Sequence, residues 1–188
     1  MAAKAASLAL ESANVSPDEI GLVLVATSTP DYNTFPSTEC LVQGLLGCKN
    51  AGAFDLQAAC AGFVYALDMA RGFVASHPER KALVIGAECL SRILDWTDRS
   101  SCILFGDGAG AVVIGAESGA DLKAESILGA DGNGRHFIQR SGGTMESLPF
   151  NPETGVPMKS EPKLPVLSLQ GHDVFAFAVR ILAKLIND

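Results

Sequence analysis

Two hydrophobic periodicities alternate along the first half of the chain. Continuous apolar runs, which are typical of strands buried on both faces, occupy residues 21–26, 51–56 and 82–86. Apolar residues repeat at helical spacing in the segments around these runs, at 4–13, 37–46 and 61–76. Strands that alternate with helices of this length predict the α/β class, with a mixed, mainly parallel sheet and helices on both of its faces.

Two short motifs predict the start of a helical turn and the end of a helix. Ser16-Pro17-Asp18-Glu19 matches a capping box with proline at the first helical position, so we expect a short helical turn before the strand at 21–26. Gly47 is the expected end of the helix at 37–46, because glycine readily adopts the left-handed conformation that terminates helices.

The pattern changes in the second half of the chain. Cys102–Phe105 and Ala111–Ile114 are strand-like, and the glycine-rich Gly106–Gly110 between them predicts the tight turn of an antiparallel hairpin. These glycines lack the spacing of a dinucleotide-binding loop, so we expect no nucleotide there. The remaining segments are a strand-like run at Lys123–Leu128, a long loop region at 129–168 and an amphipathic helix at Val174–Ile186.

Composition and charge narrow the class of protein. Apolar residues make up 48% of the 188 residues and charged residues 19%, which suits a folded chain and excludes a disordered one. The net charge of −7 provides no overall attraction for nucleic acid. Polar residues or glycines interrupt every apolar stretch before the ~20 residues of a membrane-spanning helix, so we expect no membrane partner.

The cysteine content points in the same direction. Five cysteines occur, which is an odd number, and none belongs to a C-x-x-C pair. A disulfide framework or a zinc site is therefore not expected, and we expect no other bound metal. Such a chain fits a reducing, cytoplasmic compartment.

Cys60 is the strongest candidate for chemistry. It stands between the apolar run at 51–56 and the start of the helix at 61–76, and its immediate neighbours are alanines and a glycine. The amide groups and the dipole at a helix N-terminus favour a thiolate over a thiol, and small neighbours leave room for a bulky thioester. A buried structural cysteine is the alternative, which stays open for Cys60 and is our interpretation of Cys40, Cys48, Cys89 and Cys102.

Two segments resemble a known family. DLQAACAGFVYALDMARG at 55–72 and LDWTDRSSCILFGDGAGAVVI at 94–114 are similar to β-ketoacyl-acyl carrier protein synthase III, the initiating condensing enzyme of type II fatty-acid synthesis. The resemblance covers nearly all of the chain. It implies a thiolase-like layered fold made of two similar halves, of which residues 1–188 would be the N-terminal half, without the first strand and without most of the C-terminal half.

The resemblance also implies roles for individual residues. Cys60 would be the acyl-accepting nucleophile, and its own backbone N–H would contribute to the oxyanion hole. Arg99 would contact the adenine end of coenzyme A, Phe105 the acyl pocket, and Phe35 would cross a homodimer interface to close the neighbour's acyl tunnel. The implied substrates are an acyl-coenzyme A, such as acetyl-coenzyme A, and malonyl-acyl carrier protein, and no cofactor is implied.

Condensation in this family requires a histidine and an asparagine from the C-terminal half. His77, His136 and His172 do not stand in the H-Q-A-N-like context that would supply them. The partner that we expect is a second copy in a homodimer, as the resemblance implies, or a C-terminal half that supplies these two residues. Two alternatives stay open, namely a non-catalytic truncated or split-subunit polypeptide, and a related acyltransferase or quinolone-type synthase that uses another acceptor.

Overall fold

The computed structural model describes residues 1–116, 126–140, 153–154 and 166–187. The chain divides into two compact units, which are described separately. The first unit comprises Met1–Cys89 and Asp107–Leu128, and the second comprises Leu90–Gly106 and Gly129–Asp188.

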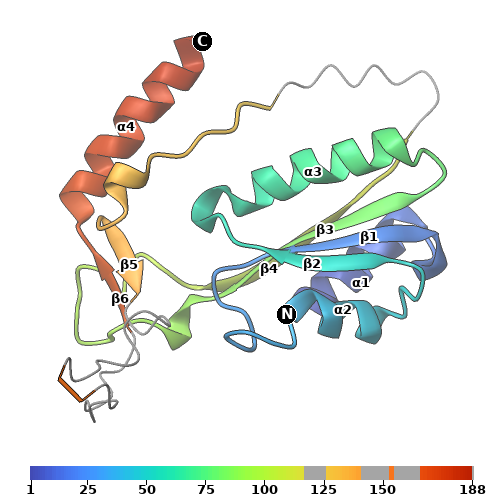
Figure 1. The fold of residues 1–188 in the computed structure, drawn as a ribbon, viewed down its shortest axis with the longest axis horizontal. Helices are drawn as coiled ribbons and strands as arrows, with labels where there is room; N and C mark the ends of the chain where they lie inside the picture. The colour runs from blue at the N-terminus through green and yellow to red at the C-terminus, as the bar shows by residue number, and fades with distance from the viewer. Residues whose placement is uncertain (117–125, 141–152, 155–165, 188) are drawn as a thin grey trace. The chain divides into compact units, whose positions relative to one another are not determined.

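A four-stranded sheet in the order β2-β1-β3-β4 forms the centre of the first unit (Figure 1). Strands β1 (Ile20–Ala26), β2 (Gly52–Leu56) and β3 (Lys81–Cys89) are parallel to one another. Strand β4 (Asp107–Ile114) pairs with β3 in the antiparallel direction. The predicted α/β class with a mixed, mainly parallel sheet is therefore confirmed.

Helices cover both faces of this sheet, as predicted (Figure 1). Helices α1 (Ala2–Ala13) and α2 (Thr38–Leu46) lie on one face, and α3 (Gly62–Ser76) lies on the other. The central strand β1 supplies both cores, because successive side chains of a strand point to opposite faces. Val23 and Val25 belong to the core under α1 and α2, whereas Leu22 and Leu24 belong to the core under α3.

Small residues let α3 lie close to the sheet. Its buried positions recur every four residues, at Gly62, Ala66, Ala70 and Val74. A Cβ atom on Gly62 would lie 3.3 Å from the Cβ of Ala26, which is tighter than ordinary contact. The residues that begin α3 are therefore seated directly on the end of β1.

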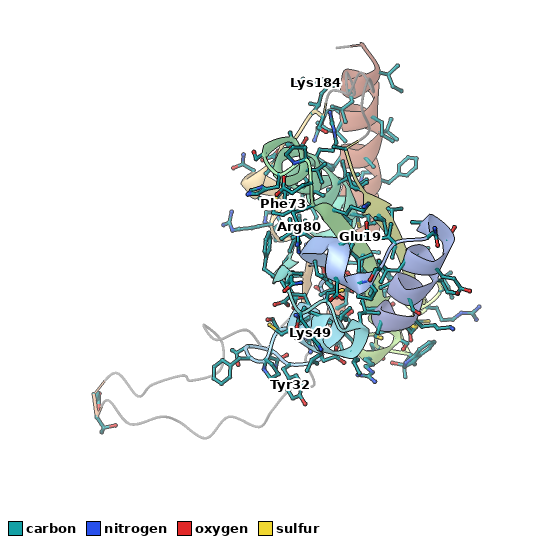
Figure 2. All side chains as sticks on the ribbon, turned by 90° about the vertical axis from the view of Figure 1, so that its right-hand side faces the viewer. Glu19, Tyr32, Lys49, Phe73, Arg80 and Lys184 are labelled. Atoms are coloured by element: carbon teal, nitrogen blue, oxygen red, sulfur yellow. The ribbon has the colours of Figure 1, made fainter. Side chains whose placement is uncertain are left out.

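Glycine also permits a close contact at the start of β1. Figure 2 shows Phe73 of α3 near Arg80, and a Cβ atom on Gly21 would lie 2.9 Å from both of these side chains. The Arg80 guanidinium donates hydrogen bonds to the carbonyl oxygens of Ile20, at 2.7 Å, and Asn50, at 3.2 Å. This arrangement closes the end of the sheet at which β1 and β3 begin.

The two motifs that predicted helix boundaries are confirmed. The Ser16 amide donates to the Glu19 carboxylate at 2.9 Å, and the Asp18 amide donates to the Ser16 hydroxyl at 3.4 Å, which completes the capping box. Gly47 ends α2 in the left-handed conformation, with φ of 75°.

The predicted hairpin around Gly106–Gly110 is wrong. Residues 101–104 form a turn, in which the Asp98 carbonyl accepts hydrogen bonds from the amides of Ser101 and Cys102. Gly108 and Gly110 instead belong to β4, whose ladder with β3 runs from Cys89↔Asp107 to Ala82↔Ile114, and Gly106 immediately precedes this strand. Pairing with a buried strand therefore overrides the turn preference of these glycines.

The strand predicted at 123–128 is not found in its described part. Residues 123–125 lie outside the described residues, and 126–128 have no regular structure.

The second unit is smaller. It contains the antiparallel pair β5 (Ile138–Arg140) and β6 (Leu167–Leu169), followed by helix α4 (Gly171–Asn187). The loop region expected at 129–168 thus includes β5 and the start of β6. The core of this unit consists of Ile93, Leu94 and Leu167, against which Leu90, Phe105 and Leu169 pack. Among the described residues, no helix is long and apolar enough to cross a membrane.

Candidate active site

Cys60 lies on a tight turn between β2 and α3. Residues Ala59–Ala61 form one turn of 3-10 helix, and α3 begins at the next residue. The Ala61 amide closes this turn by donating to the Ala58 carbonyl at 3.1 Å. The Cys60 side chain is exposed, so the structural alternative of a buried cysteine does not describe it.

The residue before Cys60 has a strained backbone. Ala59 adopts a φ of 45°, a left-handed conformation that costs an alanine of order 1–3 kcal/mol. Strand β2 ends at Leu56 and α3 begins at Gly62, so the chain changes direction within a few residues, and Ala59 lies in this turn. The strain thus places the thiol at the end of the parallel sheet, next to the first turn of α3.

The other four cysteines differ in their surroundings. Cys48 is buried, whereas Cys89 and Cys102 are half-buried. Cys40 is exposed, contrary to the expected packed position, because α2 buries Thr38, Glu39 and Val42 instead. The Cys40 thiol also donates a hydrogen bond to the Glu39 carboxylate at 3.1 Å.

The loop that carries Phe35 begins at the end of β1. The Thr27 amide donates to the Leu56 carbonyl at 3.1 Å, which ties the start of this loop to the strand that leads to Cys60. Phe35 itself is 83% exposed, and its peptide bond to Pro36 is cis. The structure therefore brings Cys60 and Phe35 into one unit and presents the aromatic ring to solvent.

A pair of carboxyl groups holds the other end of this loop, and the sequence patterns did not indicate it. Asp55 of β2 accepts hydrogen bonds from the amides of Thr38, at 2.8 Å, and Glu39, at 3.0 Å, at the N-terminus of α2. Glu39 is only 2% exposed, and its Oε2 atom has no hydrogen-bond partner in the structure. The only signal in the sequence was Asp55 itself, an acidic residue inside an otherwise apolar run.

The two carboxyl groups of this pair differ in acidity. Burial, followed by the hydrogen bond with Glu39, raises the pKa of Asp55 to about 6. Burial also opposes the ionisation of Glu39, but the hydrogen bonds from Ser37, Asp55 and Cys40 together lower its pKa. Asp55 is therefore the group of the pair that keeps its proton to higher pH.

Arg99 and Phe105 belong to the second unit. Arg99 is exposed and follows Asp98, whose carboxylate accepts hydrogen bonds from the amide and hydroxyl of Ser100 and from the hydroxyl of Ser101. Hydrogen bonds from Ser100 and Ser101 lower the pKa of Asp98. Phe105 is half-buried and packs against the core of the second unit.

Trp96 stands three residues before Arg99 in the same loop. Its ring is 65% exposed, and its indole N–H donates to the Ser91 carbonyl at 3.3 Å. The preceding carboxylate, Asp95, accepts hydrogen bonds from the amide and hydroxyl of Thr97. This loop therefore presents an aromatic ring and a guanidinium on a backbone that neighbouring carboxylates organise.

The histidines have local partners. His77 stacks on Phe73 with ring centroids 4.6 Å apart, at the C-terminal end of the helix that Cys60 precedes. His136 contacts Phe137 edge to face, and exposed His172 lies 3.7 Å from the Asp173 carboxylate. Within the described part of the chain, no group of three or more histidine, cysteine or acidic side chains is arranged to hold a metal ion.

Comparison with known proteins shows which proteins this chain resembles. A family model for 3-oxoacyl-[acyl-carrier-protein] synthase III matches residues 54–132, which include Cys60, Arg99 and Phe105. The β-ketoacyl-[acyl-carrier-protein] synthases III of Clostridium acetobutylicum and Bordetella petrii are 44% and 48% identical to this chain over 188 residues. The alignments cover the whole chain but only 55% and 53% of those relatives, so the chain spans about half of their length.

Solved structures agree with the sequence comparison. The synthase III from Thermus thermophilus superposes with a TM-score of 0.77 at 39% identity, over 96% of this chain and 52% of that one. The priming β-ketosynthase of the R1128 polyketide pathway gives a TM-score of 0.79 at 37% identity, over 98% of this chain and 52% of that one. The chain is therefore similar in sequence to β-ketoacyl-[acyl-carrier-protein] synthases III and has their thiolase-like fold over about half of their length.

Proposed function

We propose that Cys60 accepts an acyl group from an acyl-coenzyme A, in the first half-reaction of a β-ketoacyl-acyl carrier protein synthase III. The observation that carries this proposal is the exposed thiol on a strained turn at the start of α3. Exposure gives a thioester access to the sulfur, and the strained turn holds the sulfur beside the start of α3.

The acylation step involves one bond exchange. The Cys60 thiolate attacks the carbonyl carbon of the thioester, a new carbon–sulfur bond forms to Cys60, and the bond to coenzyme A breaks. The coenzyme A thiolate leaves and takes a proton from solvent, which replaces the proton that Cys60 gave up. Backbone N–H groups, including that of Cys60, are the donors that would stabilise the negative oxygen of the intermediate.

Other residues, most of them singled out by the family resemblance, would take part in substrate binding. Arg99 and the neighbouring Trp96 would contact the nucleotide end of coenzyme A, since a guanidinium pairs with phosphate and an indole stacks on a base. Phe105 would line the acyl pocket. Phe35 would reach the acyl site of a second copy in a homodimer, and its exposure in the structure supports this role.

The second half-reaction needs additional donors. Loss of carbon dioxide from malonyl-acyl carrier protein leaves a carbanion, which attacks the acyl carbonyl on Cys60, forms the β-ketoacyl product and releases the thiol. Removing one donor to the enolate charge typically costs ~10²–10³ in rate. We propose that a histidine and an asparagine outside this chain supply these donors and that the chain alone stops at acylation.

Intact-mass measurement after incubation with acetyl-coenzyme A tests the proposal. We expect one added acetyl group on the chain, none on Cys60→Ala, and full loading on Cys40→Ala, which removes the other exposed cysteine. Loading that survives Cys60→Ala but disappears in Cys40→Ala would move the site to α2. Steady formation of β-ketoacyl product after malonyl-acyl carrier protein is added, with no second polypeptide, would contradict the proposed limit to acylation.

A second candidate concerns the acyl group. The similarity to a priming β-ketosynthase of a polyketide pathway favours a priming enzyme that loads Cys60 by the same chemistry with an acyl group other than acetyl. Competition between acetyl-coenzyme A and hexanoyl-coenzyme A for Cys60, followed by intact mass, separates the two candidates by the mass of the predominant adduct.

A further inference from the structure

The Glu88 carboxylate accepts hydrogen bonds from a segment that is distant in the sequence. It lies near the end of β3, where its Oε1 atom accepts a hydrogen bond from the Ser28 amide at 2.8 Å. Its Oε2 atom accepts hydrogen bonds from the hydroxyls of Thr29 and, at 3.5 Å, Thr27. The side chain therefore binds three consecutive residues that follow β1.

The threonines close this network. The Thr29 hydroxyl accepts a hydrogen bond from the Cys89 amide at 2.8 Å while it donates to Glu88, and the Thr27 hydroxyl accepts one from the Thr29 amide at 3.1 Å. A hydroxyl has one proton and two lone pairs, so each contact has a distinct donor. Glu88 accepts three of these hydrogen bonds and each threonine hydroxyl accepts one, so Glu88 is the main acceptor of the network.

The segment that Glu88 binds is the start of the Phe35 loop. The far end of the same loop is fixed by Asp55, which accepts the amides of Thr38 and Glu39. Strand β1 lies between β2 and β3, so Asp55 and Glu88 contact the loop from the two strands that flank β1. A further hydrogen bond joins the middle of the loop to its far end, since the Asp31 amide donates to the Thr38 hydroxyl at 3.0 Å.

We propose that Glu88 is a positioning residue that fixes the start of the Phe35 loop and thereby the direction in which the loop presents Phe35. The functional part rests on the proposed function, in which Phe35 closes an acyl site. On this basis Glu88 affects which acyl chain is accepted, whereas the reactivity of Cys60 itself stays unchanged. The backbone ladder pairs Glu88 with Gly108 whatever its side chain does, so the sheet does not depend on this carboxylate.

The first experiment measures the loop directly in the full chain. Amide hydrogen exchange, read by mass spectrometry on the peptide that covers 27–38, is compared for wild type, Glu88→Ala, Glu88→Gln and the control Glu79→Ala. Glu79 is exposed and lies just before the start of β3, far from the loop. We expect about tenfold faster exchange in Glu88→Ala, no change in Glu79→Ala, and partial recovery in Glu88→Gln, whose amide still accepts the Ser28 N–H.

Limited chymotrypsin digestion gives a second view of the same loop. Cleavage after Tyr32, which is exposed in the loop, should accelerate in Glu88→Ala and not in Glu79→Ala (Figure 2). Circular dichroism spectra that match wild type show that the sheet is intact. Equal exchange and equal cleavage in Glu88→Ala and Glu79→Ala would overturn the proposal.

The second experiment has a readout that a purely structural role would not change. The ratio of hexanoyl to acetyl loading on Cys60 is measured for wild type, Glu88→Ala, Phe35→Ala and the double variant. We expect Glu88→Ala to change the ratio about threefold with the iodoacetamide rate at Cys60 unaltered, and to have no further effect in the Phe35→Ala background. An unaltered ratio in Glu88→Ala beside a changed ratio in Phe35→Ala would overturn the functional part.

The two experiments separate the failure of this inference from the failure of the proposed function. If no acyl group reaches Cys60 in wild type, the proposed function fails and the functional part fails with it, and the exchange comparison still decides whether Glu88 fixes the loop.

Discussion

Two loops of the molecule present exposed aromatic side chains, but carboxylates organise them in different ways. In the loop after β1, Glu88 and Asp55 reach their partners across 59–61 and 16–17 residues of sequence. In the loop that carries Trp96 and Arg99, Asp95 and Asp98 bind residues only two or three positions away. The first loop thus depends on the sheet, whereas the second is organised by its own sequence.

The two loops show that a loop can be ordered by hydrogen bonds within its own sequence or by hydrogen bonds to distant strands. A local turn forms wherever its few residues are present, because an acidic side chain that accepts amides two residues ahead needs no tertiary contact. A remote attachment exists only when the strands are paired, so the order of such a loop depends on the tertiary fold. The predictions below test this contrast.

Asp55→Ala should have the largest effect. The substitution leaves two amides at the N-terminus of α2 without their acceptor and removes one of the partners of buried Glu39, so we expect a loss of about 2 kcal/mol in the free energy of unfolding. Urea unfolding followed by circular dichroism measures it. The matched local variant Asp98→Ala should lower the urea midpoint much less, and equal losses in the two variants would remove the contrast.

The pH dependence of stability should follow Asp55. Its pKa is raised from 3.8 to about 6 in the folded state, so the folded chain binds this proton more tightly than the unfolded chain does. The stability that this provides is complete below 3.8 and is lost as pH rises through about 6. Glu39, with its lowered pKa, acts in the opposite direction, but its contribution is complete above its ordinary value of 4.5.

The urea midpoint of wild type should therefore fall between about pH 5.5 and about pH 7.5. Asp55→Asn should flatten this fall, because an amide does not titrate in this range. A fall of the same size in wild type and Asp55→Asn would assign the pH dependence to other groups.

Asp98→Ala should affect ligand binding more than stability. Its carboxylate organises the turn that precedes and follows Arg99, so we expect weaker acyl-coenzyme A loading, seen as a severalfold higher concentration for half-maximal rate. Iodoacetamide labelling of Cys60 should not change, since that residue lies in the other unit. A reduced labelling rate would show that the substitution acts on more than its own loop.

Ala59→Gly should have the smallest effect. Glycine accepts a φ of 45° without strain, but it also gains freedom in the unfolded state, so we expect a net stabilisation of at most ~1 kcal/mol. Ala61→Gly, two residues on in the same 3-10 turn and at a negative φ of −88°, should instead destabilise by about 0.5–1 kcal/mol. Thermal unfolding of both variants checks the opposite signs.

The same contrast explains which features the sequence predicted. The Ser16–Glu19 capping box, the end of α2 at Gly47 and the position of Cys60 before α3 depend on a few adjacent residues, and all three are present in the structure. The strand expected at Cys102–Phe105 was wrong, because the ladder between β3 and β4 decides where the glycines lie.

The candidate site was predictable only in part. Local pattern singled out Cys60, and the family resemblance singled out Phe35, Arg99 and Phe105. Glu88 and the Asp55–Glu39 pair were missed, because their partners lie far away in the sequence, in the loop after β1 for Glu88 and between β2 and α2 for the pair. The strained conformation of Ala59 was not predicted either, because alanine rarely adopts a left-handed conformation and nothing in its sequence context suggests one.

The division of the first unit into two stretches of chain has a consequence for biosynthesis. Strand β4 follows Leu90–Gly106, which belong to the other unit, so the last strand of the sheet leaves the ribosome well after β3. During translation the nascent sheet therefore has β3 as a temporary edge, whose unpaired backbone N–H and C=O groups are open to chaperones and to other nascent chains. Only when Ile114 has emerged can this edge be covered along its full register.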